Sequence, residues 1–159
     1  MSDTNMIKVG KSAPAFTLLD SSEKKIMLSD YRGKWVVLYF YPKDDTPGCT
    51  KEACEFTESI KSFKNMNAEV IGISPDSPEK HLQFIDKYKL KVNLLSDPDK
   101  KVMTKYGAFG KKKMYGKEVV GVIRSTYIID PSGKVAFNWS GVKAGGHAEK
   151  VRLKLEEIQ

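Results

Sequence analysis

The two cysteines of the chain, Cys49 and Cys54, lie in one short stretch, Tyr41–Cys54, which reads YPKDDTPGCTKEAC. Their interval of five residues is wider than that of a redox C-x-x-C pair. Two cysteines alone also fall short of the four ligands of a structural zinc site. The spacing instead fits one reactive thiol and a second thiol that reacts with it in a later step.

Cys49 is predicted to lie in the first turn of a helix, because Thr46 suits the N-cap and Pro47 the first helical position. Backbone N–H groups without partners and the positive end of the helix dipole favour an anion there, and the thiolate is the reactive form of cysteine. The alternative is a packing role, because Cys49 also begins an apolar helical stripe. The other members of that stripe are Ala53, Phe56, Ile60 and Phe63.

Cys54 leaves this apolar stripe, since five residues correspond to about 500° of helical rotation, or roughly 140° away from Cys49. In an intact helix the two Cα atoms would be about 8.6 Å apart, and a disulfide tolerates at most about 7 Å. The pair could therefore bond only after the first turns unwind, which Gly48 would ease. This suits a cycle in which an oxidant converts Cys49 to a sulfenic acid and Cys54 then attacks it. Taken alone, Cys54 is equally consistent with a tolerated surface thiol.

Three further residues are candidates to assist an incoming oxygen. Thr46 offers a hydroxyl three residues before Cys49, and Pro42 would shield the thiolate from bulk solvent. Arg124 lies within an apolar segment predicted to be one strand, VVGVIRSTYIID, where a charge is costly unless it is paired. It is either a cation fixed beside the Cys49 sulfur or an arginine that reaches to solvent from an edge strand.

The elements that must position these residues follow an α/β pattern. The run WVVLYFY at Trp35–Tyr41 is typical of a strand buried on both faces. Asp130-Pro131-Ser132-Gly133 is a turn signal that predicts an antiparallel hairpin between strands at 119–129 and 134–139. Other predicted strands lie at 69–74 and 92–95, a small N-terminal hairpin at 16–19 and 25–28, and further helices begin at Ser77 and near His147. In the helix that begins at Ser77, the residues available for the buried side are Leu82, Ile85 and Tyr88, with Phe84 beside them. The apolar residues of the last helix are Val151, Leu153, Leu155 and Ile158.

This order predicts a single domain, residues 1–159, with a mixed central sheet and helices on both faces. The formal net charge is +7, but the lysines are spread along the chain and only Arg32, Arg124 and Arg152 are arginines. That distribution favours a solvated surface over a nucleic-acid site. The sequence lacks a signal-peptide pattern and a membrane-length apolar run, so we expect a cytoplasmic protein that is not membrane-bound and whose thiols are reduced at rest.

The pattern Pro42-x3-Thr46-x2-Cys49 resembles the active-site motif of the peroxiredoxins, and Cys54 five residues later resembles their Q-type subfamily, the bacterioferritin comigratory proteins. The resemblance extends over nearly the whole chain. Its blocks are GKSAPAFTLLD, FYPKDDTPGCTKEACEF, SPDSPEKHLQFIDKY, LLSDPDKKVMTKYG and KKKMYGKEVVGVIRSTYIIDPSGKV.

The resemblance implies a thioredoxin-like fold with an N-terminal β-hairpin extension, and a thiol peroxidase that reduces hydrogen peroxide and alkyl hydroperoxides without a metal, haem or flavin. It implies that Cys49 is the peroxidatic cysteine and Cys54 the resolving one, which form an intramolecular disulfide. Thr46 and the backbone N–H of Cys49 would hold the peroxide, Pro42 would shape the pocket and Arg124 would complete it. It further implies a monomer that is recharged by thioredoxin or a glutaredoxin.

Three other functions are weighed against this one. A protein thiol–disulfide oxidoreductase would reduce insulin rather than consume peroxide, and the cysteine spacing disfavours it. A basic nucleic-acid-binding or chaperone-like protein would keep its activity in Cys49→Ser, and nucleic-acid binding would weaken steeply with salt. A metal site is the weakest option, because His81 and His147 lie far from the cysteines in sequence and are expected on helix surfaces.

Overall fold

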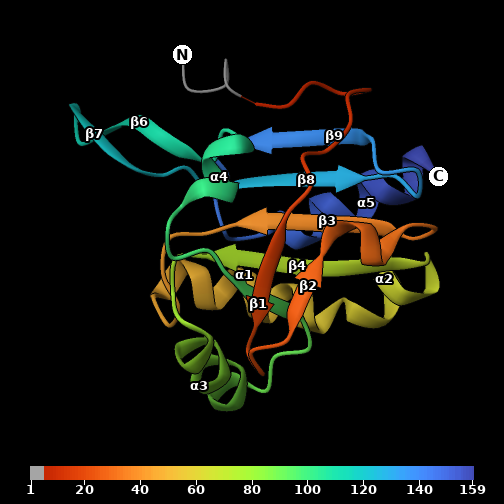
Figure 1. Ribbon diagram of the computed structural model, residues 1–159, viewed down its shortest axis with the longest axis horizontal. Helices are drawn as coiled ribbons and strands as arrows, with labels where there is room; N and C mark the ends of the chain where they lie inside the picture. Colours follow the sequence, from red (N-terminus) through yellow and green to blue (C-terminus); the bar gives the residue numbers. More distant parts are fainter. Residues whose placement is uncertain (1–5) are drawn as a thin grey trace.

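The computed structural model describes residues 6–159 and centres on a seven-stranded mixed sheet (Figure 1). The strand order is β2-β1-β5-β4-β3-β8-β9. β4 pairs in parallel with β3 and β5, and the other pairs in this sheet are antiparallel. The strands are β1 (Thr17–Asp20), β2 (Lys25–Met27), β3 (Trp35–Phe40), β4 (Ala68–Ser74), β5 (Asn93–Ser96), β8 (Ser125–Ile129) and β9 (Val135–Ser140).

The central strand β3 is buried on both faces, as its apolar run predicts. Alternate residues of a strand point to opposite faces, so β3 feeds two separate cores. Val36, Leu38 and Phe40 belong to one core, and Val37, Tyr39 and Tyr41 belong to the other. All six of these residues have an exposed fraction of 1% or less, which makes β3 the rigid support for the loop that follows it.

Helices cover both faces of the sheet. Residues of α1, α2, α3 and α5 line the core that contains Tyr39, and residues of α4, the short helix η2 and the segment before β1 line the core that contains Phe40. The helices are η2 (Leu28–Tyr31), α1 (Pro47–Glu58), α2 (Ile60–Asn65), α3 (Pro78–Tyr88), α4 (Lys101–Lys105) and α5 (His147–Ile158). The predicted α/β class, the mixed sheet and the N-terminal hairpin β1–β2 are confirmed. Among the described residues, no helix combines the length and the apolar character needed to cross a membrane.

The predicted single strand at 119–129 is wrong, because the chain leaves one sheet and enters another within it. Residues up to Val122 belong to a separate two-stranded hairpin of β6 (Phe109–Met114) and β7 (Lys117–Val122), which projects from the body at the upper left of Figure 1. Ile123 and Arg124 form a break, and β8 starts at Ser125. Arg124 therefore stands at the junction of the two sheets rather than inside a strand.

Two details of the helices also differ from the predicted pattern. The apolar stripe that begins at Cys49 is shared by two helices, because the chain bends at Ser59 between α1 and α2. On α3 the buried residues are His81 and Phe84, so Leu82, one position beyond His81, points outward and is 46% exposed. Leu153 of α5 is 51% exposed for the same reason, since Val151 and Leu155 define the buried side of that helix.

Candidate active site

The candidate site lies where β3 ends and α1 begins, at the left side of the sheet in Figure 1. The antiparallel register pairs Phe40 of β3 with Ser125 of β8. Arg124 immediately precedes Ser125, so the register brings it to the end of β3 where the loop to Cys49 starts. Two segments that are 75 residues apart in sequence are thereby joined at one point.

Cys49 is in the first turn of α1 and is only 1% exposed. The Nη2 group of Arg124 donates a hydrogen bond to its Sγ atom over 3.3 Å. A guanidinium at this distance stabilises a thiolate, and it adds to the effect of the helix N-terminus. The sequence suggested a helix start and a fixed arginine as separate features. In the structure both act on the sulfur of Cys49.

Thr46 occupies the N-cap position of α1, as predicted, but its side chain does not cap the helix. Its Oγ1 donates to the backbone oxygen of Lys43 over 2.9 Å, while its own carbonyl oxygen accepts from the backbone N–H of Thr50. The hydroxyl is therefore oriented by the loop before the helix and retains acceptor capacity. It lies half-buried at the helix start, three residues from Cys49.

Glu52 is a site residue that the sequence analysis missed. It binds Arg124 on the side opposite Cys49. Its Oε1 accepts from Arg124 Nη1 over 2.8 Å, and its side chain is fully buried. Burial raises the pKa of Glu52 to about 7, against the opposing effect of Arg124. Burial also lowers the pKa of Arg124, but Glu52 and Cys49 outweigh it and the net pKa is raised. A carboxylate three positions after Cys49, on the same helical face, was the signal available in the sequence.

The backbone around Arg124 is fixed as well as its side chain. Its carbonyl oxygen accepts from the backbone N–H of Val142, over 2.9 Å, in the turn that follows β9. A Cβ atom placed on Gly48 would lie 3.3 Å from Arg124 Nη2, so the absence of a side chain there lets the guanidinium approach the helix start. Arg124 also lines one wall of a groove of about 890 Å³ between the β6–β7 hairpin and the Gly141–Val142 turn.

Cys54 is half-buried on the same helix, and both cysteines are free thiols. Burial and then the nearby Glu58 carboxylate raise the pKa of Cys54, which disfavours its thiolate form. Arg124 contacts Cys49 and not Cys54, which distinguishes the two cysteines electrostatically.

Pro42 is the second residue after β3 and is exposed. Its position at the entrance of the loop is compatible with the shielding role predicted from the sequence. That role stays a prediction.

The expectation that both histidines lie on helix surfaces is wrong. His147 is 3% exposed, with Nε2 2.8 Å from Thr126 Oγ1, and burial lowers its pKa to about 4. His81 is completely buried on α3 and lies close to the carboxylates of Asp44 and Asp76. Helical spacing was a signal for both, since His81 lies three positions before Phe84 and His147 lies four positions before Val151.

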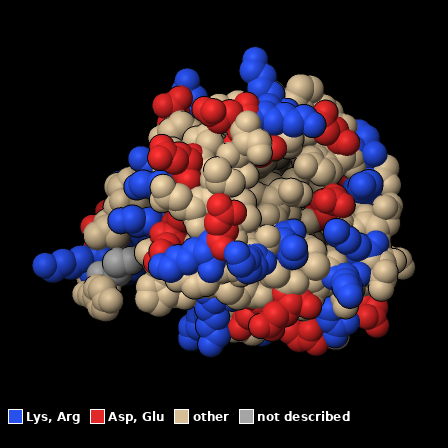
Figure 2. Space-filling view, turned by 90° about the horizontal axis from the view of Figure 1, so that it is seen from below, with Lys and Arg blue, Asp and Glu red and all other residues tan. Residues whose placement is uncertain are grey.

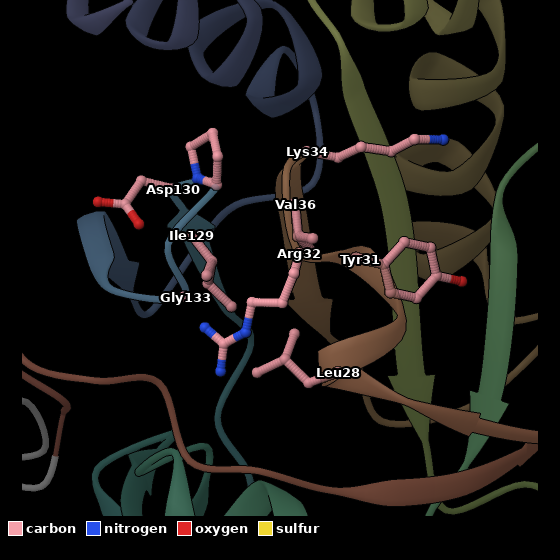
Figure 3. Close-up of a pocket in the computed structure, with 9 residues that line it drawn as sticks. Leu28, Tyr31, Arg32, Lys34, Val36, Ile129, Asp130 and Gly133 are labelled. Atoms are coloured by element: carbon pink, nitrogen blue, oxygen red, sulfur yellow. The ribbon is translucent and has the colours of Figure 1, made fainter.

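A second hollow lies at the opposite end of β3 and is too small for a substrate. Its volume is about 10 Å³, room for roughly one water molecule. Figure 3 shows the Arg32 side chain reaching toward Gly133, and its Nη1 donates to the Ser132 carbonyl oxygen. This hollow therefore reflects packing between the segment before β3 and the β8–β9 turn.

Comparison with known proteins identifies the family to which the chain belongs. Residues 9–138 match the AhpC/TSA family. Peroxiredoxin Bcp of Bacillus subtilis is 43% identical over 152 residues, which cover 96% of this chain and 97% of that protein. Peroxiredoxin Bcp of Escherichia coli is 38% identical over 153 residues, covering 96% and 98%.

Solved structures give the same result. The structure of Xanthomonas campestris peroxiredoxin Q aligns with a TM-score of 0.87 and 36% identity, covering 94% of this chain and 97% of that one. A structure of the bacterioferritin comigratory protein from the same organism, described as giving insights into its alkyl peroxide reduction activity, aligns with a TM-score of 0.87 and 35% identity, covering 94% and 98%. The chain belongs to the AhpC/TSA family, and within it to the peroxiredoxins of the Bcp, or Q, type.

Proposed function

We propose that Cys49 is the peroxidatic cysteine of this thiol peroxidase and that Cys54 is its resolving cysteine. The observation that carries this assignment is the hydrogen bond from Arg124 Nη2 to Cys49 Sγ, in the first turn of a helix. It stabilises the nucleophilic form of one cysteine and leaves the other as a thiol with a raised pKa.

In the first step the Cys49 thiolate attacks the outer oxygen of a hydroperoxide. The O–O bond breaks, the leaving alkoxide or hydroxide takes up the proton that the Cys49 thiol gave up on ionising, and Cys49 becomes a sulfenic acid. The Thr46 hydroxyl and the backbone N–H of Cys49 would hold the peroxide oxygens, and Pro42 would shield the sulfur from bulk water. Arg124 would stabilise the negative charge that moves from sulfur to the leaving oxygen.

In the second step Cys54 attacks the sulfenic sulfur of Cys49, a disulfide forms and water leaves. The helix must unwind first, because an intact helix keeps these two positions too far apart for a disulfide. A protein dithiol then supplies two electrons and two protons to regenerate both thiols.

The reductant is proposed to be thioredoxin or a glutaredoxin, and the protein is proposed to act as a cytoplasmic monomer. The substrates are hydrogen peroxide and organic hydroperoxides, and the alkyl peroxide reduction activity ascribed to the Xanthomonas campestris protein supports the organic class. The chemistry needs only the two thiols of the chain, so we propose no metal or organic cofactor.

A single-turnover experiment tests the assignment. The reduced protein, at low concentration, receives one equivalent of hydrogen peroxide, and free thiols and intact mass are measured. We expect both thiols to be lost and the mass to fall by two hydrogens, with the protein monomeric on a non-reducing gel. A disulfide-linked dimer would mean resolution between chains, and two surviving thiols beside persisting peroxide would refute the assignment.

The two cysteine variants separate the two roles. Cys49→Ser should abolish peroxide consumption, because no nucleophile remains in the site. Cys54→Ser should keep the fast first oxidation, seen as a stable sulfenic acid by mass, and stall turnover with thioredoxin. Equal losses of the first step in both variants would contradict this division.

A further inference from the structure

The proposed chemistry makes no use of His81, yet this is a completely buried histidine on α3. Its Nδ1 lies 2.6 Å from Asp44 Oδ2, and its Nε2 lies 3.0 Å from the backbone oxygen of Leu95 on β5. Asp44 is 8% exposed and belongs to the loop that connects β3 to α1. His81 therefore joins the loop of the candidate site to two elements of the body.

The hydrogen-bond partners determine where the protons lie. A carbonyl oxygen only accepts, so Nε2 of His81 carries a proton and donates it to Leu95. The short contact between Nδ1 and Asp44 Oδ2 engages the second ring nitrogen, so the imidazole is held on both sides.

The two aspartates of this group accept further hydrogen bonds. Asp44 Oδ1 accepts from the Tyr41 hydroxyl over 2.5 Å. Asp76 Oδ2 accepts from the backbone N–H of Asp44 and from the Ser74 hydroxyl, each over 2.7 Å. Although Asp44, Asp76 and His81 lie close enough together to suggest a cation site, their polar atoms are directed at one another. The group holds a loop in place rather than a ligand.

A second pair of contacts on the surface holds the neighbouring residue. Asp45 accepts from Lys87 Nζ over 2.8 Å and from the Tyr88 hydroxyl over 2.5 Å, both at the end of α3. Asp45 has a positive φ of 60°, a left-handed conformation that these contacts help to maintain. Thr46, the next residue, is the N-cap of α1. The start of the Cys49 helix is thus fixed to α3 on both its buried and its exposed side.

We propose that His81 is a positioning residue for the peroxidase reaction. Together with Tyr41, Asp44 and Asp76 it forms a clamp, the His81 clamp, that holds the start of α1 in the folded form. The proposal rests on the proposed function, because the two steps need opposite states of this helix. Peroxide attack needs the helix start intact beside Arg124, and disulfide formation needs it unwound. The clamp therefore sets the balance between the two steps.

Removal of the clamp should change the two rates in opposite directions. A buried charge-assisted hydrogen bond stabilises by an amount that corresponds to a change of about tenfold or more in a local equilibrium. In His81→Ala we expect oxidation of Cys49 by peroxide to slow several-fold and disulfide formation from the sulfenic acid to accelerate by up to about tenfold. A purely structural role would lower the thermal midpoint without moving the two rates apart.

The test measures both rates in one turnover by quenched flow and intact mass, with thermal unfolding as a parallel reading. Asp44→Asn is the conservative variant, since its amide can still form hydrogen bonds with His81 and Tyr41 but carries no charge. Both of its rates should fall between those of the wild type and of His81→Ala. Val135→Ala is the matched control, because Val135 is a buried residue of the other core and does not belong to the clamp.

A milder variant keeps the proposal testable if His81→Ala does not fold. Tyr41→Phe removes only the hydroxyl that donates to Asp44 and should shift both rates in the same directions by a smaller factor. If the wild type forms its disulfide normally but neither variant changes the ratio of the two rates more than Val135→Ala does, the clamp proposal is wrong. If the wild type forms no disulfide at all, the proposed function fails first.

Discussion

At the scale of single residues, the site is a line of three groups in which Arg124 stands between a buried carboxylate and a sulfur. Glu52 orients one nitrogen of the guanidinium, and the other nitrogen reaches Cys49. Because the guanidinium is planar, fixing Nη1 also fixes the direction of Nη2. The Glu52 carboxylate thus acts on the sulfur through Arg124. This role gives a reason for a buried carboxylate, whose desolvation costs free energy.

Removing the guanidinium should slow peroxide attack. In a Glu52→Gln background, which avoids leaving a carboxylate without its partner, Arg124→Ala should lower the rate of Cys49 oxidation by about a hundredfold, the usual effect of losing one charge-stabilising donor. The measurement is the second-order rate with hydrogen peroxide, beside the thermal midpoint. Glu52→Gln alone is the control. An unchanged rate with a large loss of stability would assign Arg124 a structural role instead.

The raised pKa of Glu52 predicts a pH-dependent stability. Its folded pKa is about 7, and its reference value is 4.5. Between these values the folded state binds more protons than the unfolded state, so the stabilisation present below pH 4.5 is lost as pH rises through 7. Relative to Glu52→Gln, the wild type should lose roughly 3 kcal/mol of unfolding free energy across this range.

Urea unfolding of both proteins at pH 5 and pH 8 measures this difference. Glu58→Gln, on the exposed face of the same helix, reports the background effect of removing a carboxylate from α1. If wild type and Glu52→Gln differ by the same amount at both pH values, the Glu52 carboxyl is not held in its protonated form by burial.

The residues of the site differ in how well the sequence predicts them. Cys49, Thr46 and Arg124 are predictable, because a helix start and an isolated charge in an apolar segment are local signals. Glu52 and His81 are only partly predictable: each lies on the apolar side of its helix, three positions from Cys49 and from Phe84 respectively, but the spacing does not reveal what either residue binds. Their burial depends on partners 72 and 37 residues away, and only the tertiary structure supplies those partners.

At the scale of elements, the packing of the sheet against α1 depends on a missing side chain on β4. The ring of Tyr39 on β3 stacks on Phe56 of α1, with ring centroids 4.9 Å apart. A Cβ atom on Gly72 of β4 would lie 2.6 Å from Tyr39 Cζ and 2.9 Å from Leu94 Cδ2. The absence of a side chain on Gly72 therefore leaves room for the stacked rings of Tyr39 and Phe56.

Gly72→Ala should overpack this layer and destabilise the protein by about 1–3 kcal/mol. Thermal unfolding measures the effect, and Gly110→Ala is the control, since a Cβ there meets no atom within 4 Å. Tyr39→Phe, which removes the hydroxyl 2.8 Å from the added Cβ, should restore part of the loss. Equal midpoints for the two alanine variants would mean that the core absorbs the extra methyl group.

Among the elements, the sequence predicts the strands of the main sheet and the helices α1, α3 and α5, but it misses η2, α4 and the β6–β7 hairpin. Lys111–Lys113 interrupts the apolar alternation expected of a strand, so β6 has the pattern of a solvated loop. Tyr115 and Gly116 both have positive φ, which is typical of a two-residue hairpin turn, and the glycine alone is a weak signal of it. If that turn is not recognised, the sequence pattern of β7 and β8 predicts one continuous strand, and the break at Ile123 and Arg124 is missed.

At the scale of the whole molecule, charge is mixed over the surface. Figure 2 shows Lys and Arg interspersed with Asp and Glu, and the hairpin protruding at the left. The hairpin carries the main group of exposed apolar side chains among the described residues, Tyr115, Val119 and Val120. In its register Lys112 faces Val119 and Lys111 faces Val120, so each of the two valines has a lysine opposite it. Lysines on an exposed edge oppose association between copies of the same chain.

This arrangement predicts that the protein is monomeric in both redox states. Light scattering coupled to size exclusion should give about 17.9 kDa for the reduced form and for the form oxidised with one equivalent of peroxide. Pairing of two hairpins would bring like charges together, so high salt is the condition most favourable to a dimer. A dimer already present at physiological salt would contradict the prediction. If Val120→Lys dissolved that dimer and the exposed Leu82→Lys on α3 did not, the hairpin would be the interface.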